Sequence, residues 1–405
     1  MKLWVYILRR FLLLVPILIG VMTITFALVS AIPPEQRLVS YFGSPPFHYV
    51  GGYNPTVPCS ALHINQTGEC PNPLYNRLIA KIGLNQPIWT QWALYMYQTF
   101  TFHWGYVDND SAVGQLFANT QHQPVVTVLG WFLPYTTELA ILSLAMILFV
   151  AIPVGNITAA NRNRPVDQAA RIFSFSGLAL PTYTLGAILI VAVIIWFGSS
   201  TGYITHSPWC PTGEGTFFEL YGSWPQNSCY PGSVYPSWLT YGIISHPTGF
   251  PTVDAMIHGQ WALAADSLLR LILPAILIST GTIAFLLRFV RNSMLEVLNL
   301  DYVRTARANG ISERIVVKRH AGRNSLNVTV TVLGLTLAGF LGGFPVVELI
   351  FHLNGVGLML ADSALPPYDY GMLFGSTILF TYLVVFANLI VDVIYAWLDP
   401  RVRLG

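Results

Sequence analysis

The stretch with the most chemical content lies at residues 294–325, which read MLEVLNLDYVRTARANGISERIVVKRHAGRNS. Apolar residues recur there at i, i+3, i+7 and i+11, which predicts a helix with one apolar stripe, formed by Leu295, Leu298, Tyr302 and Ala306. Arg304 and Arg307 project from its other faces. The segment is predicted to be cytoplasmic, and its pattern is too regular for a mere linker.

A turn follows this helix. Asn309-Gly310 predicts its end, because glycine readily takes the left-handed C-cap conformation. Ser312 is suited to cap a second helix, with Glu313 in its first turn. The result is a short helix-turn-helix with two open interpretations: an amphipathic segment held on anionic lipid by its arginines, or a docking element for a cytosolic protein.

Other residues with chemical potential lie far from this segment. The spacing of the four cysteines fits no CxxC metal pattern, and their placement in predicted external segments favours two disulfides, Cys59 with Cys70 and Cys210 with Cys229. Asn65 and Asn109 begin sequons that could accept glycans. No GxxxxGK[ST] loop for a nucleotide phosphate occurs.

The composition identifies the solvent around these elements. Of the 405 residues 54% are hydrophobic and 9% are charged, whereas a soluble domain carries roughly 25% charged residues. The net charge of +2 supplies no basic field for nucleic acid, so no nucleic-acid partner is expected. The chain is expected to lie largely in lipid.

The hydropathy pattern predicts an all-α polytopic membrane protein. A transmembrane helix needs about 20 mainly apolar residues, and six stretches qualify: Phe11 to Ile32, Tyr135 to Ala160, Ile172 to Phe197, Leu269 to Phe289, Val328 to Phe351 and Leu373 to Leu398. We expect Pro181 to interrupt the third of them. Acids within the spans lie near their ends, where structural roles are expected: Glu138, Glu348 and Asp392.

The positive charges orient the six helices. With the N-terminus inside the cell, sixteen of the twenty Lys and Arg residues fall on the cytoplasmic side, as the positive-inside rule requires. Only Arg37, Arg77, Lys81 and Arg270 fall outside. Both termini are therefore predicted to be cytoplasmic in a multi-pass protein of the plasma or inner membrane.

The apolar stretches and their orientation divide the chain into three parts. These are an N-terminal helix at 1–33, an external insert at 34–133, and a five-helix core at 134–405. The insert contains helix-like stretches at 74–82 and 87–102. The core includes an external loop at 198–268 and the cytoplasmic segment at 294–325. Candidates for lining a pathway through the core are Pro181, Tyr183, Gly339 and Gly342.

Motifs spread along the chain carry a family resemblance. The run from Tyr302 to Gly310, YVRTARANG, followed by RHAGRN, resembles the EAA loop of ABC importer permeases, in the form of the dipeptide/oligopeptide branch. Further matches occur in the same order, namely ILRRFLLLVPILIGVMTITF, GLNQPIWTQW, TTELAILSL, LPTYTLG, GVGLML and LDPRVR. In this alignment Arg304 stands at the motif's Glu position and Thr305 at its first Ala.

The resemblance implies a B-type permease subunit, which is not an enzyme and binds no cofactor. It implies a second homologous permease, two ATPase subunits that hold ATP and Mg, and an extracellular substrate-binding protein. Docking to the ATPases would be through the EAA loop, with contact candidates at Arg304, Thr305, Ala306, Arg307, Gly310 and Glu313.

The solute and the energy source leave alternatives. Oligopeptides are the family's usual solutes, and oligosaccharides are an alternative because the external loop is rich in aromatic residues and poor in charge. An ion-coupled secondary transporter is the alternative outside the ABC class. That class predicts inverted repeats and paired acids at the bilayer midplane, and neither is visible in the sequence.

Overall fold

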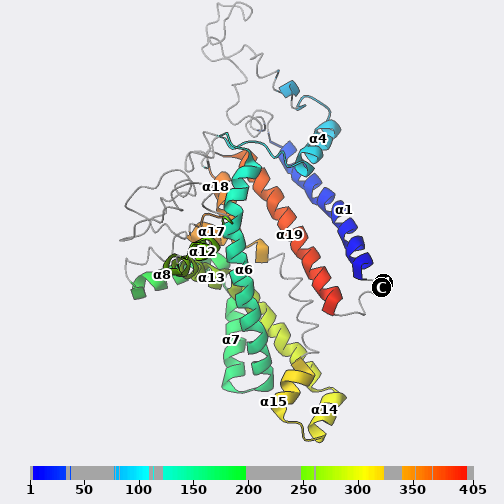
Figure 1. The fold of residues 1–405 in the computed structure, drawn as a ribbon, viewed down its shortest axis with the longest axis vertical. Helices are drawn as coiled ribbons and strands as arrows, with labels where there is room; N and C mark the ends of the chain where they lie inside the picture. The colour runs from blue at the N-terminus through cyan, green and yellow to red at the C-terminus, as the bar shows by residue number, and fades with distance from the viewer. Residues whose placement is uncertain are drawn as a thin grey trace, which may run out of the picture.

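The computed structural model describes residues 3–32, 83–108, 122–197, 248–259, 261–322, 340–351, 353–366 and 368–398, and in addition Arg37, Arg77, residues 79–81 and Val113. Their regular structure is helical, with one isolated bridge between Tyr106 and Pro124. The helices, arranged as in Figure 1, are α1 Leu3–Ser30, α4 Ile88–Phe100, α6 Val125–Ala160, α7 Pro165–Ala179, α8 Thr182–Phe197, α12 Pro251–Ile257, α13 Trp261–Leu298, α14 Asp301–Ala308, α15 Glu313–Ile315, η5 Val316–Ala321, α17 Phe344–Phe351, α18 Val356–Ser363 and α19 Tyr370–Leu398.

Four of these helices, α1, α6, α13 and α19, are long and apolar enough to cross a membrane alone. Two bent pairs, α7 with α8 and α17 with α18, each qualify as a span when taken together. The described residues therefore contain four to six spans, and each of the six predicted stretches overlaps one of these units. The all-helical class is confirmed.

Two helix boundaries differ from those predicted. α6 begins at Val125 rather than Tyr135, so it takes in the end of the predicted insert, and it continues through Pro134. The early turns are helical because residues at helical spacing bury one face, namely Val125, Val128, Leu129 and Phe132. α13 likewise extends beyond 269–289 in both directions, and Arg270, which was predicted at a boundary, is buried within it.

The third predicted span is broken where the sequence indicates. α7 ends at Ala179, α8 begins at Thr182, and their axes differ by 111°. Pro181 lies at the break, because its ring and missing N–H disfavour a continuous helix. A second bend of 86° separates α17 from α18.

Small residues bring the core helices together around α13. A methyl group added at Gly177 of α7 would lie 2.9 Å from the Cβ of Ala284, and one at Gly186 of α8 would lie 2.9 Å from Leu277. Both partners belong to α13. Close backbone approach at small residues is the usual way that helices associate in membranes.

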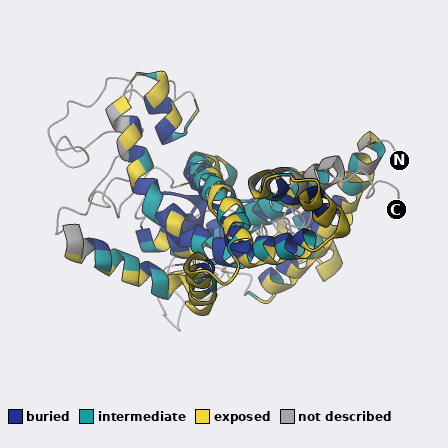
Figure 2. Ribbon diagram, turned by 90° about the horizontal axis from the view of Figure 1, so that it is seen from below, coloured by how far each residue is buried: buried dark blue, intermediate teal, exposed yellow. Residues whose placement is uncertain are grey.

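α1 and α19 pack side by side and run in opposite directions (Figure 1). Arg10 near the start of α1 pairs with Asp392 near the end of α19 at 3.2 Å. The start of α1 and the end of α19 consequently lie on the same side of the molecule, as Figure 2 shows beside its N and C labels. Exposed and buried residues alternate around the helices in that view, and apolar side chains such as Phe149 are among the most exposed, as expected for a lipid-facing surface.

Candidate functional site

The segment at 294–325 extends beyond the ends of α6 and α7 (Figure 1). α13 ends at Leu298, α14 follows at Asp301–Ala308, and α15 continues directly into a π-helical turn, η5. The predicted helix-turn-helix is therefore present. The first helix is shorter than predicted, because a break at Asn299 and Leu300 separates it from α13.

The turn between the two helices is built on Gly310, whose φ of +76° lies in the left-handed region. Its N–H donates to the carbonyl of Arg307 at 3.0 Å, and the Ile311 N–H donates to the carbonyl of Ala306 at 3.3 Å. A methyl group added at Gly310 would meet no atom within 4 Å. Glycine is required there by backbone conformation rather than by space.

Ser312 precedes α15, as predicted, but its role as a side-chain cap is wrong. Its hydroxyl makes no capping hydrogen bond. The carbonyl of Ser312 instead accepts hydrogen bonds from the N–H groups of Ile315 and Val316, at 2.9 and 3.0 Å. Backbone geometry therefore starts the second helix without help from the hydroxyl.

An apolar cluster holds the helix-turn-helix against the membrane core. Its buried members are Ala159, Met294, Leu298, Val303, Ala306, Val316 and Ala321. Because Ala159 lies in the last turn of α6 and Met294 lies in α13, the segment is attached to both long helices. Ala306 faces this interior. The predicted stripe is wrong at Tyr302, which is exposed while Val303 is fully buried; the break after Leu298 changes the helical phase.

Charged side chains occupy the outer face of the turn. Arg307 donates from Nη2 to Glu313 Oε1 at 2.7 Å and from Nε to Oε2 at 3.0 Å. This bidentate contact lowers the pKa of the Glu313 carboxyl and raises the pKa of the Arg307 guanidinium. Arg304 lies 3.5 Å from Asp301 in a highly exposed pair, and Thr305 is exposed beside it.

A buried carboxylate fixes the neighbouring helix ends. Asp167 of α7 is 0% exposed and accepts from Arg291 of α13, at 2.5 Å from Nε and 3.1 Å from Nη2. It also pairs with Arg171 and accepts from the N–H of Asn163. In the sequence, Arg171 and Arg291 indicate only the orientation of the helices, through the positive-inside rule. The sequence feature that could have indicated this site is Asp167 itself, the acid in the first helical turn after Pro165.

A second polar network lies where the span α17–α18 bends. Glu348 is 1% exposed and its carboxylate accepts from the Thr136 hydroxyl of α6 at 2.7 Å and from the Leu358 N–H at 3.0 Å. Glu138 similarly accepts from the Thr252 N–H at 3.0 Å. Asp392 likewise has a partner, Arg10. All three acids therefore have bonding partners, and their structural roles stay predictions.

The described residues that were predicted to line a pathway lie apart from the turn at Gly310. Pro181 and Tyr183 are exposed at the α7–α8 break, and Gly342 is exposed in the turn before α17. Gly339 lies outside the described residues. The four cysteines, Asn65 and Asn109 also lie outside them, so the disulfides and glycans stay predictions.

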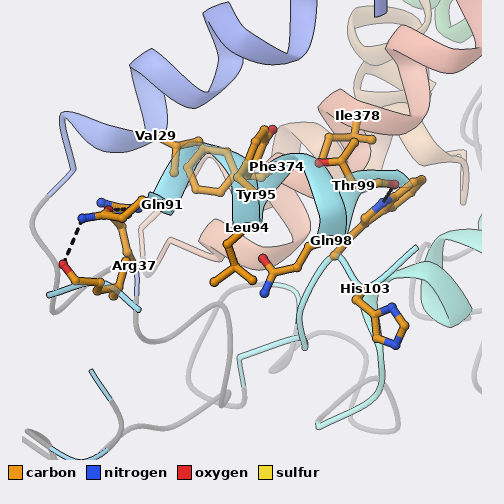
Figure 3. Close-up of a pocket in the computed structure, with 12 residues that line it drawn as sticks. Val29, Arg37, Gln91, Leu94, Tyr95, Gln98, Thr99, His103, Phe374 and Ile378 are labelled. Atoms are coloured by element: carbon orange, nitrogen blue, oxygen red, sulfur yellow. Dashed lines mark hydrogen bonds between the residues drawn. The ribbon is translucent and has the colours of Figure 1, made fainter. Parts of the chain in front are cut away.

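A small pocket lies between α1, α4 and α19 (Figure 3), and α4 is at the opposite end of the molecule from α14 and α15 (Figure 1). Arg37 donates to Gln91 Oε1 at 3.1 Å at its edge, and Tyr95, His103 and Phe374 contribute to its walls. Its volume of about 40 Å³ has room for only a few waters. The prediction of a helix in the insert at 87–102 is confirmed by α4.

Within the described residues, no cluster of His, Cys, Asp and Glu is suited to a metal ion.

Comparison with known proteins identifies the family. Residues 151–404 match the family model described as "Binding-protein-dependent transport system inner membrane component". The chain is 30% identical over 398 residues to the oligopeptide transport system permease protein AppB of Bacillus subtilis, across 98% of this chain and 99% of that protein. It is also 30% identical over 402 residues to the dipeptide transport system permease protein DppB of Escherichia coli, across 98% of each. Both relatives carry peptide names, and neither supports the oligosaccharide alternative. The chain therefore belongs to the permease subunits of binding-protein-dependent dipeptide and oligopeptide ABC importers, and is a multi-pass plasma-membrane protein that is not itself an enzyme.

Proposed function

We propose that this chain forms, with a second homologous permease, the membrane path for dipeptides or oligopeptides, and that residues 294–325 transmit the state of a cytosolic ATPase to that path. The peptide assignment rests on the names of relatives that align along nearly the whole chain. ATP and Mg would be held by two ATPase subunits, and an extracellular binding protein would deliver the solute. Six spans with both chain ends in the cytosol are part of the proposal.

The observation that carries the coupling role is the attachment of the turn. The cluster around Val303 and Val316 joins the helix-turn-helix to the ends of α6 and α13. Since side chains in a packed cluster move together, a push on the turn is transmitted to both long helices. A segment that merely rests on lipid needs no such attachment.

The six contact candidates take different roles. Arg304, Thr305 and Gly310 are exposed and available to a partner. Arg307 and Glu313 hold each other across the turn, so their main role is to fix its shape. Ala306 is buried and supports α14 from inside.

The test is a matched pair of glycine substitutions in the reconstituted importer. Gly310→Val places a β-branched residue at positive φ, at a cost of at least about 1–2 kcal/mol. Gly259→Val imposes the same strain at the other end of α13, where φ is +71° and the space is equally open. ATP hydrolysis stimulated by loaded binding protein is the measurement.

We expect Gly310→Val to lose most of this stimulation while Gly259→Val retains it. Gly310→Asn should restore it, because asparagine tolerates the left-handed region. Normal stimulation in Gly310→Val would refute the coupling role. Uptake of labelled dipeptides, competed by unlabelled peptides and by oligosaccharides, tests the solute class in the same vesicles.

A further inference from the structure

A basic cavity lies between α7 and α13, about 220 Å³ in volume. Three arginines line it, Arg171 from α7 and Arg288 and Arg291 from α13, together with Ser174 and Phe175 of α7. The turn between α6 and α7, which carries Asn163, is at the same end of the molecule as α14 and α15 (Figure 1). In the proposed orientation this is the cytoplasmic end.

The charges around the cavity do not cancel. Asp167 is the carboxylate that pairs with Arg171 and Arg291. Arg288 has its guanidinium 5.8 Å from the centre of the Phe175 ring and, among the described residues, no carboxylate within ion-pair distance. Three positive charges against one negative charge leave the cavity cationic, and a cation over an aromatic face remains available to an anion.

Two buried polar atoms in the cavity wall lack partners. The hydroxyl of Ser174, a residue that is 4% exposed, and Nε of Arg171 have no hydrogen-bond partner among the described residues. Buried polar groups are normally satisfied, so an orphaned hydroxyl beside several guanidinium groups suggests a missing acceptor. An anionic oxygen can accept from the hydroxyl and from the arginines at the same time.

The surroundings favour a lipid as the source of that anion. Ile172, Phe175 and Leu178 are exposed on the same helix at 67%, 63% and 45%, and they provide an apolar surface for acyl chains. The 36 residues of α6 span about 54 Å, against a hydrocarbon core of about 30 Å. α6 is therefore longer than the hydrocarbon core. In the proposed orientation we expect its last turn and the start of α7 to reach the cytoplasmic headgroup region, and Ser174 lies roughly 14 Å along α7 from that start.

We propose that this cavity binds the phosphate of an anionic phospholipid from the cytoplasmic leaflet, with Arg288, Arg171 and Ser174 as donors. The bound lipid would join α7 to α13 at the level of the Asp167 ion pairs. The inference depends on the orientation in the proposed function but not on ATP coupling. Basic pockets between transmembrane helices on the cytoplasmic side are a known mode of lipid recognition.

The test counts lipids on the whole importer complex, released from nanodiscs of phosphatidylcholine and phosphatidylglycerol into mild detergent and weighed by native mass spectrometry. Arg288→Gln removes the cation that pairs with no described carboxylate, and Ser174→Ala removes only the hydroxyl. Arg164→Gln is the control, since Arg164 lies at the same end of the molecule but is exposed, and among the described residues its guanidinium bonds only the side chain of Asn161.

We expect Arg288→Gln to reduce retained phosphatidylglycerol about fivefold, Ser174→Ala to reduce it less, and Arg164→Gln to leave it unchanged. Equal retention in Arg288→Gln and the control would overturn the proposal. So would the absence of retained phosphatidylglycerol from the wild type, the result expected if the second permease covers the cavity. Displacement of the lipid by inorganic phosphate alone would overturn the lipid assignment. Because no ATP or binding protein is present, this result is separable from the outcome of the Gly310 test.

Discussion

The Thr136 hydroxyl and the Glu348 carboxylate form a buried hydrogen bond of 2.7 Å between residues 212 positions apart. The same hydroxyl oxygen accepts from the Val356 N–H at 2.9 Å, and the other carboxylate oxygen accepts from the Leu358 N–H at 3.0 Å. These bonds connect α6, α17 and α18. They satisfy backbone N–H groups that the sharp bend before α18 leaves without helical partners.

Replacing Thr136 tests this network. Thr136→Val keeps the shape of the side chain but removes both the donor to Glu348 and the acceptor for Val356. Two buried polar groups then lose their partner, so we expect a loss of about 1–3 kcal/mol in the free energy of unfolding. Thr136→Ser retains the hydroxyl and is expected to lose less than half of that. Thermal unfolding of the purified complex in detergent gives the comparison, and equal midpoints for the two variants would contradict the prediction.

The close packing of the same bend is tested at Gly357. A methyl group there would lie 2.7 Å from the Cα of Pro345, which is backbone and cannot move aside cheaply. We expect Gly357→Ala to lower stability and transport, with an overpacking cost of about 1–3 kcal/mol. Gly281→Ala in α13 is the control, because a methyl group there meets nothing within 4 Å and alanine favours the helix. A neutral result for Gly357→Ala would show that α18 can shift.

Because Asp167 forms buried ion pairs, replacing it by an uncharged residue should lower the free energy of unfolding strongly. Asp167→Asn leaves Arg291, whose side chain is 14% exposed, without its carboxylate. Removing one partner of a buried ion pair lowers the free energy of unfolding by about 3–5 kcal/mol. Asp301→Asn removes an acid that is 97% exposed and 3.5 Å from Arg304, so it should cost under ~1 kcal/mol. Unfolding of the two variants at neutral pH, in one detergent, measures the difference. Similar losses would mean that water screens Asp167.

The sequence predicted those elements that depend on the residue types of one short stretch of the chain. Gly310 was predicted as a left-handed turn and Pro181 as a break, because each depends on the conformational limits of one residue. The apolar stretches predicted the long helices for the same reason, since about 20 apolar residues suffice for a span. The helix-turn-helix at 294–325 was predicted from its apolar spacing and from Gly310, whose positive φ marks the turn.

Two kinds of feature were not predicted: a helix break that no proline or glycine marks, and contacts between residues far apart in the sequence. The helical phase at Tyr302 was wrong because the chain breaks after Leu298, where no proline or glycine marks it. Arg291 lies 124 positions from its partner Asp167, and Thr136 lies 212 positions from its partner Glu348. A hydropathy pattern contains no information on such long-range pairing. The predicted span begins at Tyr135, but burial of Val125 and Phe132 extends α6 toward the N-terminus and through Pro134.

The last prediction separates two roles for Arg307 and Glu313. Their pair is 40% and 59% exposed, so it should contribute only about 0–1 kcal/mol to stability. Because the folded-state pKa of Glu313 is lowered below its ordinary 4.5, that contribution is fully present above pH 4.5 and is lost as the pH falls through the folded-state value. At neutral pH, we expect Arg307→Glu or Glu313→Arg alone to reduce ATPase stimulation severalfold, since like charges then face each other across the turn. The exchanged double variant recreates the pair and should recover most of the stimulation if the two residues shape the turn. If the double variant stays as defective as the single ones, each side chain instead contacts the ATPase directly, and the shape-fixing role assigned to this pair is wrong.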